Sequence, residues 1–125
     1  MNENTQIKVL IRKNVMRIGL DRPHKKNALT DSMYDSMRRA LADAGKNPDV
    51  RVVLFHGTKE VFCAGNDLKG FDDRDPDKAS PGVRFLSVLE AFNKPVVAAV
   101  SGIAVGIGVT LLMHCDLAYT AEDTH

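Results

Sequence analysis

Cysteine is scarce in this chain, and neither the cysteines nor the histidines are arranged as metal sites or redox motifs require. The two cysteines, Cys63 and Cys115, are far apart and lie in apolar segments, so both are expected to be free thiols. The four histidines lack the close spacing of metal ligands. These absences predict no metal site. Unpaired thiols favour a reducing compartment, for which we expect the cytoplasm.

The chain also lacks an excess of either charge. It has 17 Lys and Arg residues against 16 Asp and Glu residues, which gives a formal net charge of +1. Electrostatic attraction to nucleic acid or to an anionic membrane therefore has no basis, and we expect neither as a partner. The opening residues, MNENTQIK, lack the basic segment and apolar core of a secretion signal, so export is not expected.

Several motifs of well-known enzyme classes are missing as well. No lysine follows the glycines of residues 102–108, as a phosphate-binding GxxxxGK[ST] loop requires, and a GxGxxG fingerprint would need a glycine in place of Leu111. Ser101 lies in VSGIA, which is not the GxSxG turn of the serine hydrolases. A nucleotide-phosphate cradle and a nucleophilic serine are therefore disfavoured.

The apolar segment at residues 94–116, KPVVAAVSGIAVGIGVTLLMHCD, is the most informative part of the chain. Residues 95–113 have only Ser101 and Thr110 as polar side chains, and this run is long enough to span a bilayer. Its β-branched start, its three central glycines and its lack of aromatic anchors instead predict a buried strand, a glycine-lined turn and a core helix. Such a junction exposes backbone N–H groups that can stabilise an anion.

Hydropathy patterns along the whole chain predict an α/β domain. Alternating and apolar runs indicate strands at residues 6–12, 16–20, 50–55, 96–100 and 117–120, the third of them buried on both faces. Thr30 and Ser80 are suited to cap helices, because apolar residues follow each of them at helical spacing. We expect residues 61–69, VFCAGNDLK, to form a loop that opens into a short turn of helix. Strands that alternate with helices indicate crossover connections.

Two glycine-bearing loops follow two successive core strands. The loop CAGND at residues 63–67 follows the strand predicted at 50–55, and GIAVGIG at residues 102–108 follows the strand predicted at 96–100. Loops at the same strand ends of an α/β sheet converge on one crevice, and small residues let the backbone approach a ligand. Either loop alone is compatible with a plain turn, whereas the pair predicts a binding site.

Three segments, in this order, resemble the hallmark motifs of the crotonase superfamily, the enoyl-CoA hydratases and isomerases. They are LDRPHKKNAL at 20–29, VFCAGNDLK at 61–69 and the segment at 94–125. GNDL and VGIGVTLL are similar to the Δ3,Δ2-enoyl-CoA isomerase branch, whereas the hydratases usually carry AGAD and GGGCEL. The resemblance implies a crotonase-like (ClpP/crotonase) α/β spiral of β-β-α units. Residues 1–125 would be the N-terminal part of that domain, with its C-terminal half absent from this chain.

The resemblance also implies a site for an acyl-CoA thioester. The backbone N–H groups of Asn66 and Ile107 would form an oxyanion hole for the thioester carbonyl. Further substrate contacts are implied for Lys25, with a solvated surface position as its alternative, and for Ala64, Gly65, Asn66, Asp67, Leu68, Gly106 and Ile107. Coenzyme A is part of the substrate, so no separate cofactor is expected. A homo-oligomer, either a trimer or a dimer of trimers, is implied as well.

The position of Thr110 bears on the reaction. The hydratases of the superfamily use two glutamates, and Thr110 stands where one of them would be. A hydroxyl cannot replace a carboxylate that activates water, whereas an isomerase needs only one carboxylate to move a proton from the α to the γ carbon. The resemblance therefore favours isomerisation of 3-enoyl-CoA to 2-enoyl-CoA in fatty acid or related acyl-CoA metabolism. Enoyl-CoA hydratase is the alternative.

The general base is not expected within this chain. In the isomerases of the superfamily, the base lies downstream of the segment that ends at His125. We interpret Glu122 and Asp123 as solvated surface residues. An alternative of another class follows, namely a catalytically incomplete fragment or CoA-binding module.

Overall fold

The computed structural model describes residues 6–67 and 80–121. In chain order, its elements are β1 (Ile7–Arg12), β2 (Val15–Leu20), the short 3-10 helix η2 (Pro23–Lys25), α1 (Asp31–Lys46), β3 (Val52–His56), β4 (Val61–Cys63), α2 (Pro81–Ala91), β5 (Val96–Val100), β6 (Ile103–Ala104), α3 (Ile107–Met113) and β7 (Leu117–Thr120). Strands and helices alternate along the chain, as the hydropathy patterns predicted.

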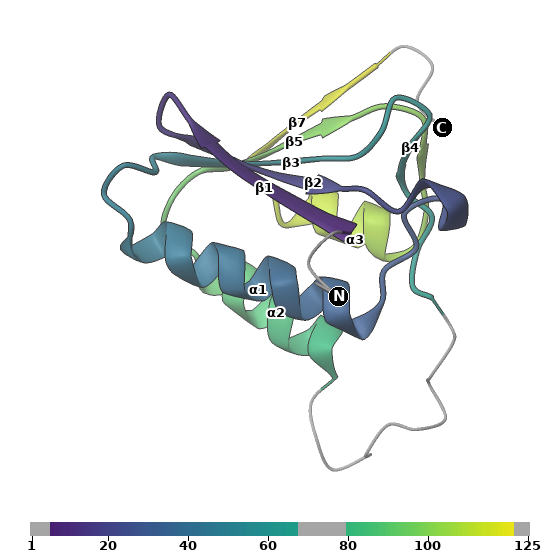
Figure 1. Ribbon diagram of the computed structural model, residues 1–125, viewed down its shortest axis with the longest axis horizontal. Coiled ribbons are helices and arrows are strands. Elements are labelled where there is room, and N and C mark those ends of the chain that lie inside the picture. Colours follow the sequence, from purple (N-terminus) through teal and green to yellow (C-terminus); the bar gives the residue numbers. More distant parts are fainter. Residues whose placement is uncertain (1–5, 68–79, 122–125) are drawn as a thin grey trace.

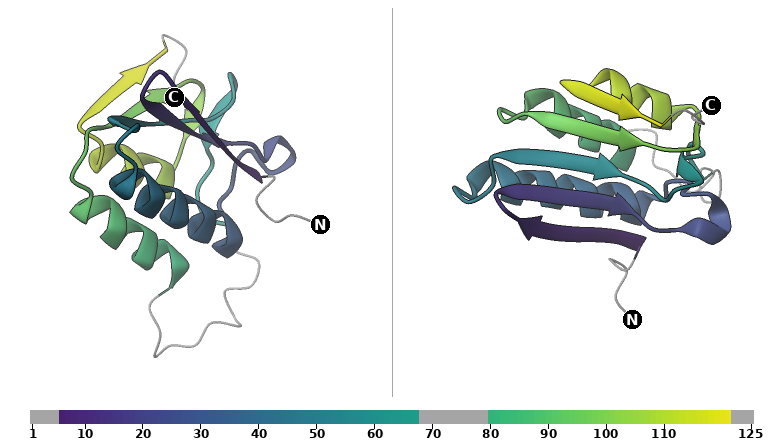
Figure 2. Two further views of the ribbon diagram at one scale, coloured as in Figure 1. Left: turned by 60° about the vertical axis from the view of Figure 1, so that its left-hand side comes forward. Right: turned by 90° about the horizontal axis from the view of Figure 1, so that it is seen from above.

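A five-stranded sheet in the order β1-β2-β3-β5-β7 forms the centre of the fold. β1 is antiparallel to β2, whereas β3, β5 and β7 extend the sheet in parallel, as the predicted crossovers require. Figures 1 and 2 show that helices α1, α2 and α3 all lie on one face of this sheet. The two-residue turn between β1 and β2 uses positive φ angles at Lys13 (52°) and Asn14 (67°), which match the twist of a tight hairpin.

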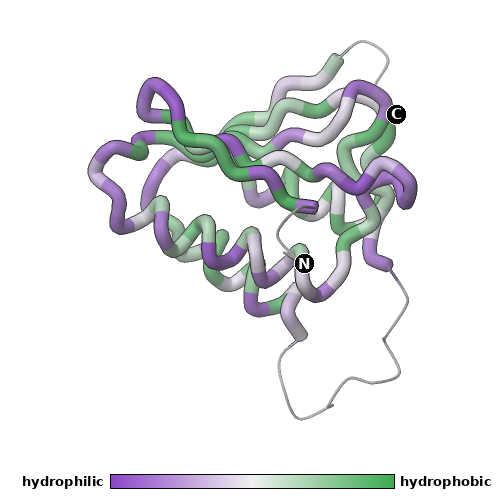
Figure 3. The backbone as a smooth tube through the Cα atoms, in the orientation of Figure 1, coloured by the Kyte–Doolittle hydropathy of each residue, from purple (hydrophilic) through white to green (hydrophobic). Residues whose placement is uncertain are grey.

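The core lies between the helices and the covered face of the sheet. Phe85 of α2 meets the ring of Phe55 edge-on at 6.1 Å and that of Tyr34 at 5.9 Å. Other fully buried side chains are Ile18, Met37, Leu41, Val53 and Leu111. Full burial of each such side chain contributes about 1.5–3 kcal/mol. Polar residues instead gather at the β1–β2 turn and around η2 (Figure 3).

Both predicted helix starts are confirmed. The Thr30 side chain accepts a hydrogen bond from Met33 N at 3.1 Å, and that of Ser80 accepts one from Val83 N at 3.2 Å. Each cap satisfies one of the backbone N–H groups that a first helical turn leaves without a partner. Pro81 occupies the first helical position of α2, where no donor is needed.

Two sequence-based expectations about strands were wrong. Residues 61–63 form β4 rather than a loop, because they pair in parallel with β6, which was itself expected to be part of a turn. β3 is fully buried on one face only. Val53 and Phe55 face the helices, whereas Leu54 on the other face is half-buried.

The apolar run at residues 95–113 is divided among β5, β6 and α3, as the strand–turn–helix interpretation predicted, with β6 added within the turn. Gly102 turns the chain at φ +76°, and a Cβ there would lie 1.7 Å from the carbonyl oxygen of Glu60. Only glycine fits so close an approach. Within the described ranges, the structure contains no helix with the length and apolarity that a membrane crossing requires.

Candidate active site

The two glycine-bearing loops lie side by side. β4 pairs with β6 through Val61 opposite Ile103, and Val105 N donates to Cys63 O at 2.9 Å just beyond that pair. A Cβ on Gly106 would lie 3.9 Å from the Cα of Gly65. The loops predicted to converge therefore do so. Their contact is made by the small β4–β6 sheet, which lies at the carboxyl ends of the central strands (Figure 1).

The loop after β4 is held by hydrogen bonds to Leu29. Leu29 N donates to Gly65 O at 2.8 Å, and Asp67 N donates to Leu29 O at 2.9 Å. These two bonds engage the backbone groups on either side of Asn66 in a parallel bridge. The N–H of Asn66 itself has no acceptor among residues 6–67 and 80–121.

The loop after β6 ends in a helix start. Gly106 is the N-cap of α3 at φ 58°, and its carbonyl accepts from Val109 N and Thr110 N. Ile107 is the first helical residue, and within the described part of the chain its N–H meets no acceptor. Gly108 lets this helix start approach β4, since a Cβ there would lie 2.8 Å from Cys63 O.

Asn66 and Ile107 border the same hollow. Its volume is about 140 Å³. The remaining lining residues come from α1, from the start of α2 and from the residue before it, and they are Tyr34, Ser80, Gly82, Val83 and Leu86. None of these described lining residues carries a carboxylate. The hollow therefore combines two residues with unengaged N–H groups and a largely apolar wall.

Tyr34 is a site residue that the sequence analysis missed. Its hydroxyl donates to the side-chain Oδ1 of Asn66, although only 2% of Tyr34 is exposed. Tyr34 follows Thr30 in α1, and its ring is packed in the core against Phe85. A buried tyrosine also needs a hydrogen-bond partner for its hydroxyl, and this requirement could have indicated that Tyr34 contacts a polar group at the site.

Asp67 is engaged by a buried network. Its Oδ2 lies 2.8 Å from Arg22 NH1, with side-chain exposures of 17% and 10%. The same Arg22 nitrogen donates to Ala28 O at 3.0 Å. Asn27 extends the network, because its Oδ1 accepts from Arg22 N and its Nδ2 donates to the carbonyls of Val61 and Phe62. The Asp67 carboxylate therefore anchors the loop to the segment around η2.

The other predicted substrate contacts are spread around the loop. Lys25 is exposed in η2, and its neighbour Lys26 accepts a hydrogen bond from Ala64 N at 3.0 Å through its backbone carbonyl. The two lysines thus lie beside the loop, outside the residues that line the hollow. Gly106 is exposed. Leu68 lies outside the described residues, as do Glu122 and Asp123.

Thr110 lies one turn of α3 after Gly106. Its hydroxyl donates to the Gly106 carbonyl at 3.3 Å. Where the hydratases have one of their glutamates, this chain therefore has a hydroxyl that is hydrogen-bonded to the N-cap residue of the same helix.

Both cysteines are free thiols, as predicted. Burial raises the pKa of the Cys63 thiol. Burial first, and then the negative charge of Asp116, raise the pKa of Cys115 to about 11. Neutral thiols are poor nucleophiles, so neither cysteine is suited to covalent catalysis at neutral pH.

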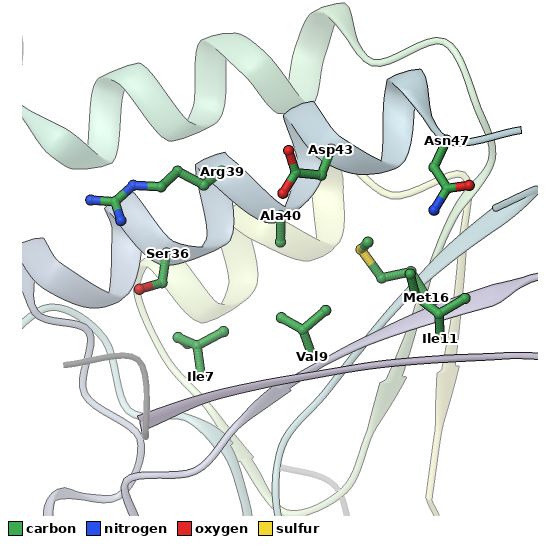
Figure 4. A pocket seen from close by; sticks show the side chains of 9 residues that line it. All are labelled: Ile7, Val9, Ile11, Met16, Ser36, Arg39, Ala40, Asp43 and Asn47. Atoms are coloured by element: carbon green, nitrogen blue, oxygen red, sulfur yellow. The ribbon is translucent and has the colours of Figure 1, made fainter. Parts of the chain in front are cut away.

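A larger hollow, of about 590 Å³, lies between β1 and α1 (Figure 4). Ile7, Val9 and Ile11 of β1 point into it, opposite Arg39 and Asp43 of α1. None of the residues of the two glycine-bearing loops lines it. Size alone therefore does not identify the site.

Comparison with known proteins places this geometry in a family. The sequence model described as enoyl-CoA hydratase/isomerase matches residues 11–125. The "Probable enoyl-CoA hydratase echA6" of Mycobacterium leprae (strain TN) is 36% identical over 116 residues, which cover 89% of this chain and 46% of that protein. The "Enoyl-CoA delta isomerase 2" of Homo sapiens is 37% identical over 116 residues, which cover 86% of this chain and 29% of that protein.

A solved structure agrees with these sequence relatives and confirms the predicted crotonase-like fold class. The structure of Pseudomonas aeruginosa OdaA superposes with a TM-score of 0.88 at 47% identity, covering 94% of this chain and 48% of that one. The chain spans about half the length of the first curated relatives it matches, 46% and 48%. Since both hydratases and isomerases occur among these relatives, their names do not distinguish the two reactions.

Proposed function

The chain belongs to the enoyl-CoA hydratase/isomerase family, and from this premise we propose that it binds an acyl-CoA thioester with the carbonyl between the N–H groups of Asn66 and Ile107. One observation carries the proposal. Two backbone N–H groups without described acceptors belong to residues on one hollow, and the β4–β6 pairing holds their loops together. Asn66 is exposed and Ile107 is half-buried, so both N–H groups are open to an acceptor from outside the chain.

The arrangement suits enolate chemistry. Removal of the proton α to a thioester places negative charge on the carbonyl oxygen, and preorganised donors stabilise that charge. One such donor is worth about 3–4 kcal/mol in the transition state. The acyl chain would lie against Gly82, Val83 and Leu86, and the coenzyme A arm would follow the loop from Ala64 to Leu68 toward Lys25.

For the longer protein that the relatives represent, we propose isomerisation of 3-enoyl-CoA to 2-enoyl-CoA. Thr110 supports this choice, because its hydroxyl is bonded to Gly106 O and no carboxylate is present at that position. The proposed general base is an Asp or Glu outside residues 1–125. No acidic side chain lines the hollow among the described residues.

Two alternative functions remain, and one observation supports each of them. Enoyl-CoA hydratase is supported by the hydratases among the relatives. Binding of CoA thioesters without turnover is supported by the hollow's lack of a described carboxylate. We also propose a homo-oligomer, from the resemblance alone, and a cytoplasmic location, from the two free thiols.

A binding measurement tests the proposal with the 125-residue chain. The probe is 2-butenoyl-CoA labelled with ¹³C at the thioester carbonyl, observed by NMR alongside calorimetry. We expect saturable binding and a downfield displacement of the carbonyl resonance, because hydrogen bonds to the oxygen polarise the carbonyl group. Free coenzyme A is the control, since it lacks the carbonyl. Absence of binding at millimolar probe would contradict the proposal.

A second measurement separates the reactions. A version extended to the length of the relatives is assayed with 3-enoyl-CoA and with 2-enoyl-CoA. Isomerisation is expected to exceed hydration. Brisk hydration with negligible movement of the double bond would favour the hydratase, and binding without either reaction would favour the binding module.

A further inference from the structure

Tyr34 connects the rigid core to the proposed oxyanion hole. It lies on α1, is 2% exposed and lines the hollow together with Asn66 and Ile107. Its hydroxyl donates to Asn66 Oδ1 from 32 residues away in the sequence. A core side chain thus holds the side chain of the residue that presents one of the open N–H groups.

The Tyr34 ring has little freedom to move. It packs against the ring of Phe85 at a centroid distance of 5.9 Å. On another side it meets the first turn of α2, where a Cβ on Gly82 would lie 3.2 Å from the ring. Close packing of this kind fixes the position of the hydroxyl oxygen.

Asn66, in contrast, is an exposed loop residue whose N–H direction depends on the torsion angles around it. The residue before it, Gly65, has φ +108° and no side chain to restrict its backbone. Leu29 holds the carbonyl of Gly65 and the N–H of Asp67, which lie on either side. The Asn66 side chain itself is held by the hydrogen bond from the Tyr34 hydroxyl.

We propose that Tyr34 is a positioning residue for the oxyanion hole, and this inference rests on the proposed function. Its hydroxyl holds the Asn66 side chain and thereby restricts the direction in which the Asn66 N–H points. Because hydrogen bonds weaken steeply as donor and acceptor lose alignment, a loop freed from Tyr34 would polarise the thioester carbonyl less well. Tyr34 acts through Asn66 and is not proposed to touch the reacting atoms.

Replacement of Tyr34 by phenylalanine isolates the hydroxyl, because the ring that packs on Phe85 remains. The experiment measures the ¹³C displacement and the dissociation constant of labelled 2-butenoyl-CoA for the wild-type chain, Tyr34→Phe, Asn66→Ala and the double variant. Asn66→Ala keeps the backbone N–H and removes the side-chain partner of Tyr34. Tyr119→Phe is the matched control, since Tyr119 is 65% exposed on β7 and does not line this hollow.

Both single variants are expected to reduce the carbonyl displacement and to weaken binding by about fivefold, the effect of one net hydrogen bond. The double variant is expected to show no larger reduction in carbonyl displacement or in affinity than either single variant, because both substitutions remove the same interaction. Tyr119→Phe should behave like the wild type. If Tyr34→Phe fails to fold, Asn66→Ala alone must reproduce the reduced displacement.

The outcomes distinguish the inference from the proposed function. A wild-type chain that shows neither binding nor displacement contradicts the proposed function. A wild-type chain that shows both, with an unchanged Tyr34→Phe variant, overturns only the role of Tyr34. Additive effects in the double variant would also overturn that role, because they would mean that Tyr34 and Asn66 act independently.

Discussion

The guanidinium of Arg22 lies 2.8 Å from the carboxylate of Asp67, and this ion pair joins two segments that are 45 residues apart. Arg22 precedes η2, and Asp67 ends the described part of the loop that carries Asn66. Because both side chains are largely buried, each charge depends on the other for its compensation. The pair therefore stabilises the loop on which one proposed donor lies.

Removal of one partner of this pair should reduce the free energy of unfolding. Asp67→Ala leaves the buried guanidinium of Arg22 without its carboxylate, and we expect a loss of about 3 kcal/mol in the free energy of unfolding. Urea denaturation followed by circular dichroism measures the loss. Asp21→Ala is the control, because its pair with Lys8 is 4.0 Å long and both side chains are about half exposed. That variant should change stability by less than about 1 kcal/mol. Equal effects of the two variants would contradict the anchoring role of Asp67.

The contribution of the Ile107 N–H can be tested by Ile107→Pro. Ile107 is the first residue of α3, a position at which proline is tolerated because its missing N–H has no intrahelical partner. We expect a folded variant that binds 2-butenoyl-CoA about fivefold more weakly and displaces its carbonyl resonance less. Ile107→Val keeps the N–H and is the control. An unchanged resonance with Ile107→Pro would exclude this donor.

Alanine substitutions at two glycines should change the stability of the chain in opposite directions. Gly102→Ala places a Cβ 1.7 Å from Glu60 O at a positive φ, so severe destabilisation or failure to fold is expected. Gly45→Ala lies within α1, where the nearest atom is 3.7 Å away on the Phe92 ring. It should raise stability by about 0.5–1 kcal/mol. Melting temperatures of both variants measure these effects, and a tolerated Gly102→Ala would be inconsistent with the described turn.

Stability should decline at alkaline pH through Cys115. Its pKa is raised from 9.0 to about 11 in the folded chain, so the folded state holds the thiol proton more tightly than the unfolded state does. This contribution to stability is complete below pH 9 and is lost as the pH rises to about 11. Denaturation of the wild type and of Cys115→Ala between pH 8 and 11 measures it. The variant should show the shallower decline, and parallel curves would contradict the prediction.

Local signals in the sequence were sufficient for several elements. Thr30 and Ser80 marked helix starts, because a cap is made between residues only three positions apart. The glycines near residue 102 marked the division of the long apolar run. β4 and β6 could not be found in this way, because they have three and two residues, too few for a hydropathy period. They are strands because they pair with each other.

The candidate site was predicted in part. Resemblance pointed to Asn66 and Ile107, and the structure places both on one hollow, although their role as donors stays a prediction. The substrate contact expected for Asp67 also stays a prediction, and its carboxylate is paired with Arg22. Tyr34 was not predicted as a site residue. Its hydroxyl partner belongs to a loop that no periodicity of α1 could indicate.

Four features could be predicted before the fold was known, namely the alternation of strands and helices, the helix caps, the free state of both thiols and the family. Each of these depends on neighbouring residues or on motifs written along the chain. Three other relationships became visible in the folded chain: Asn66 and Ile107 line one hollow, Arg22 holds Asp67, and Tyr34 holds Asn66. These are contacts between groups tens of residues apart, whose distances exist only after the strands have paired.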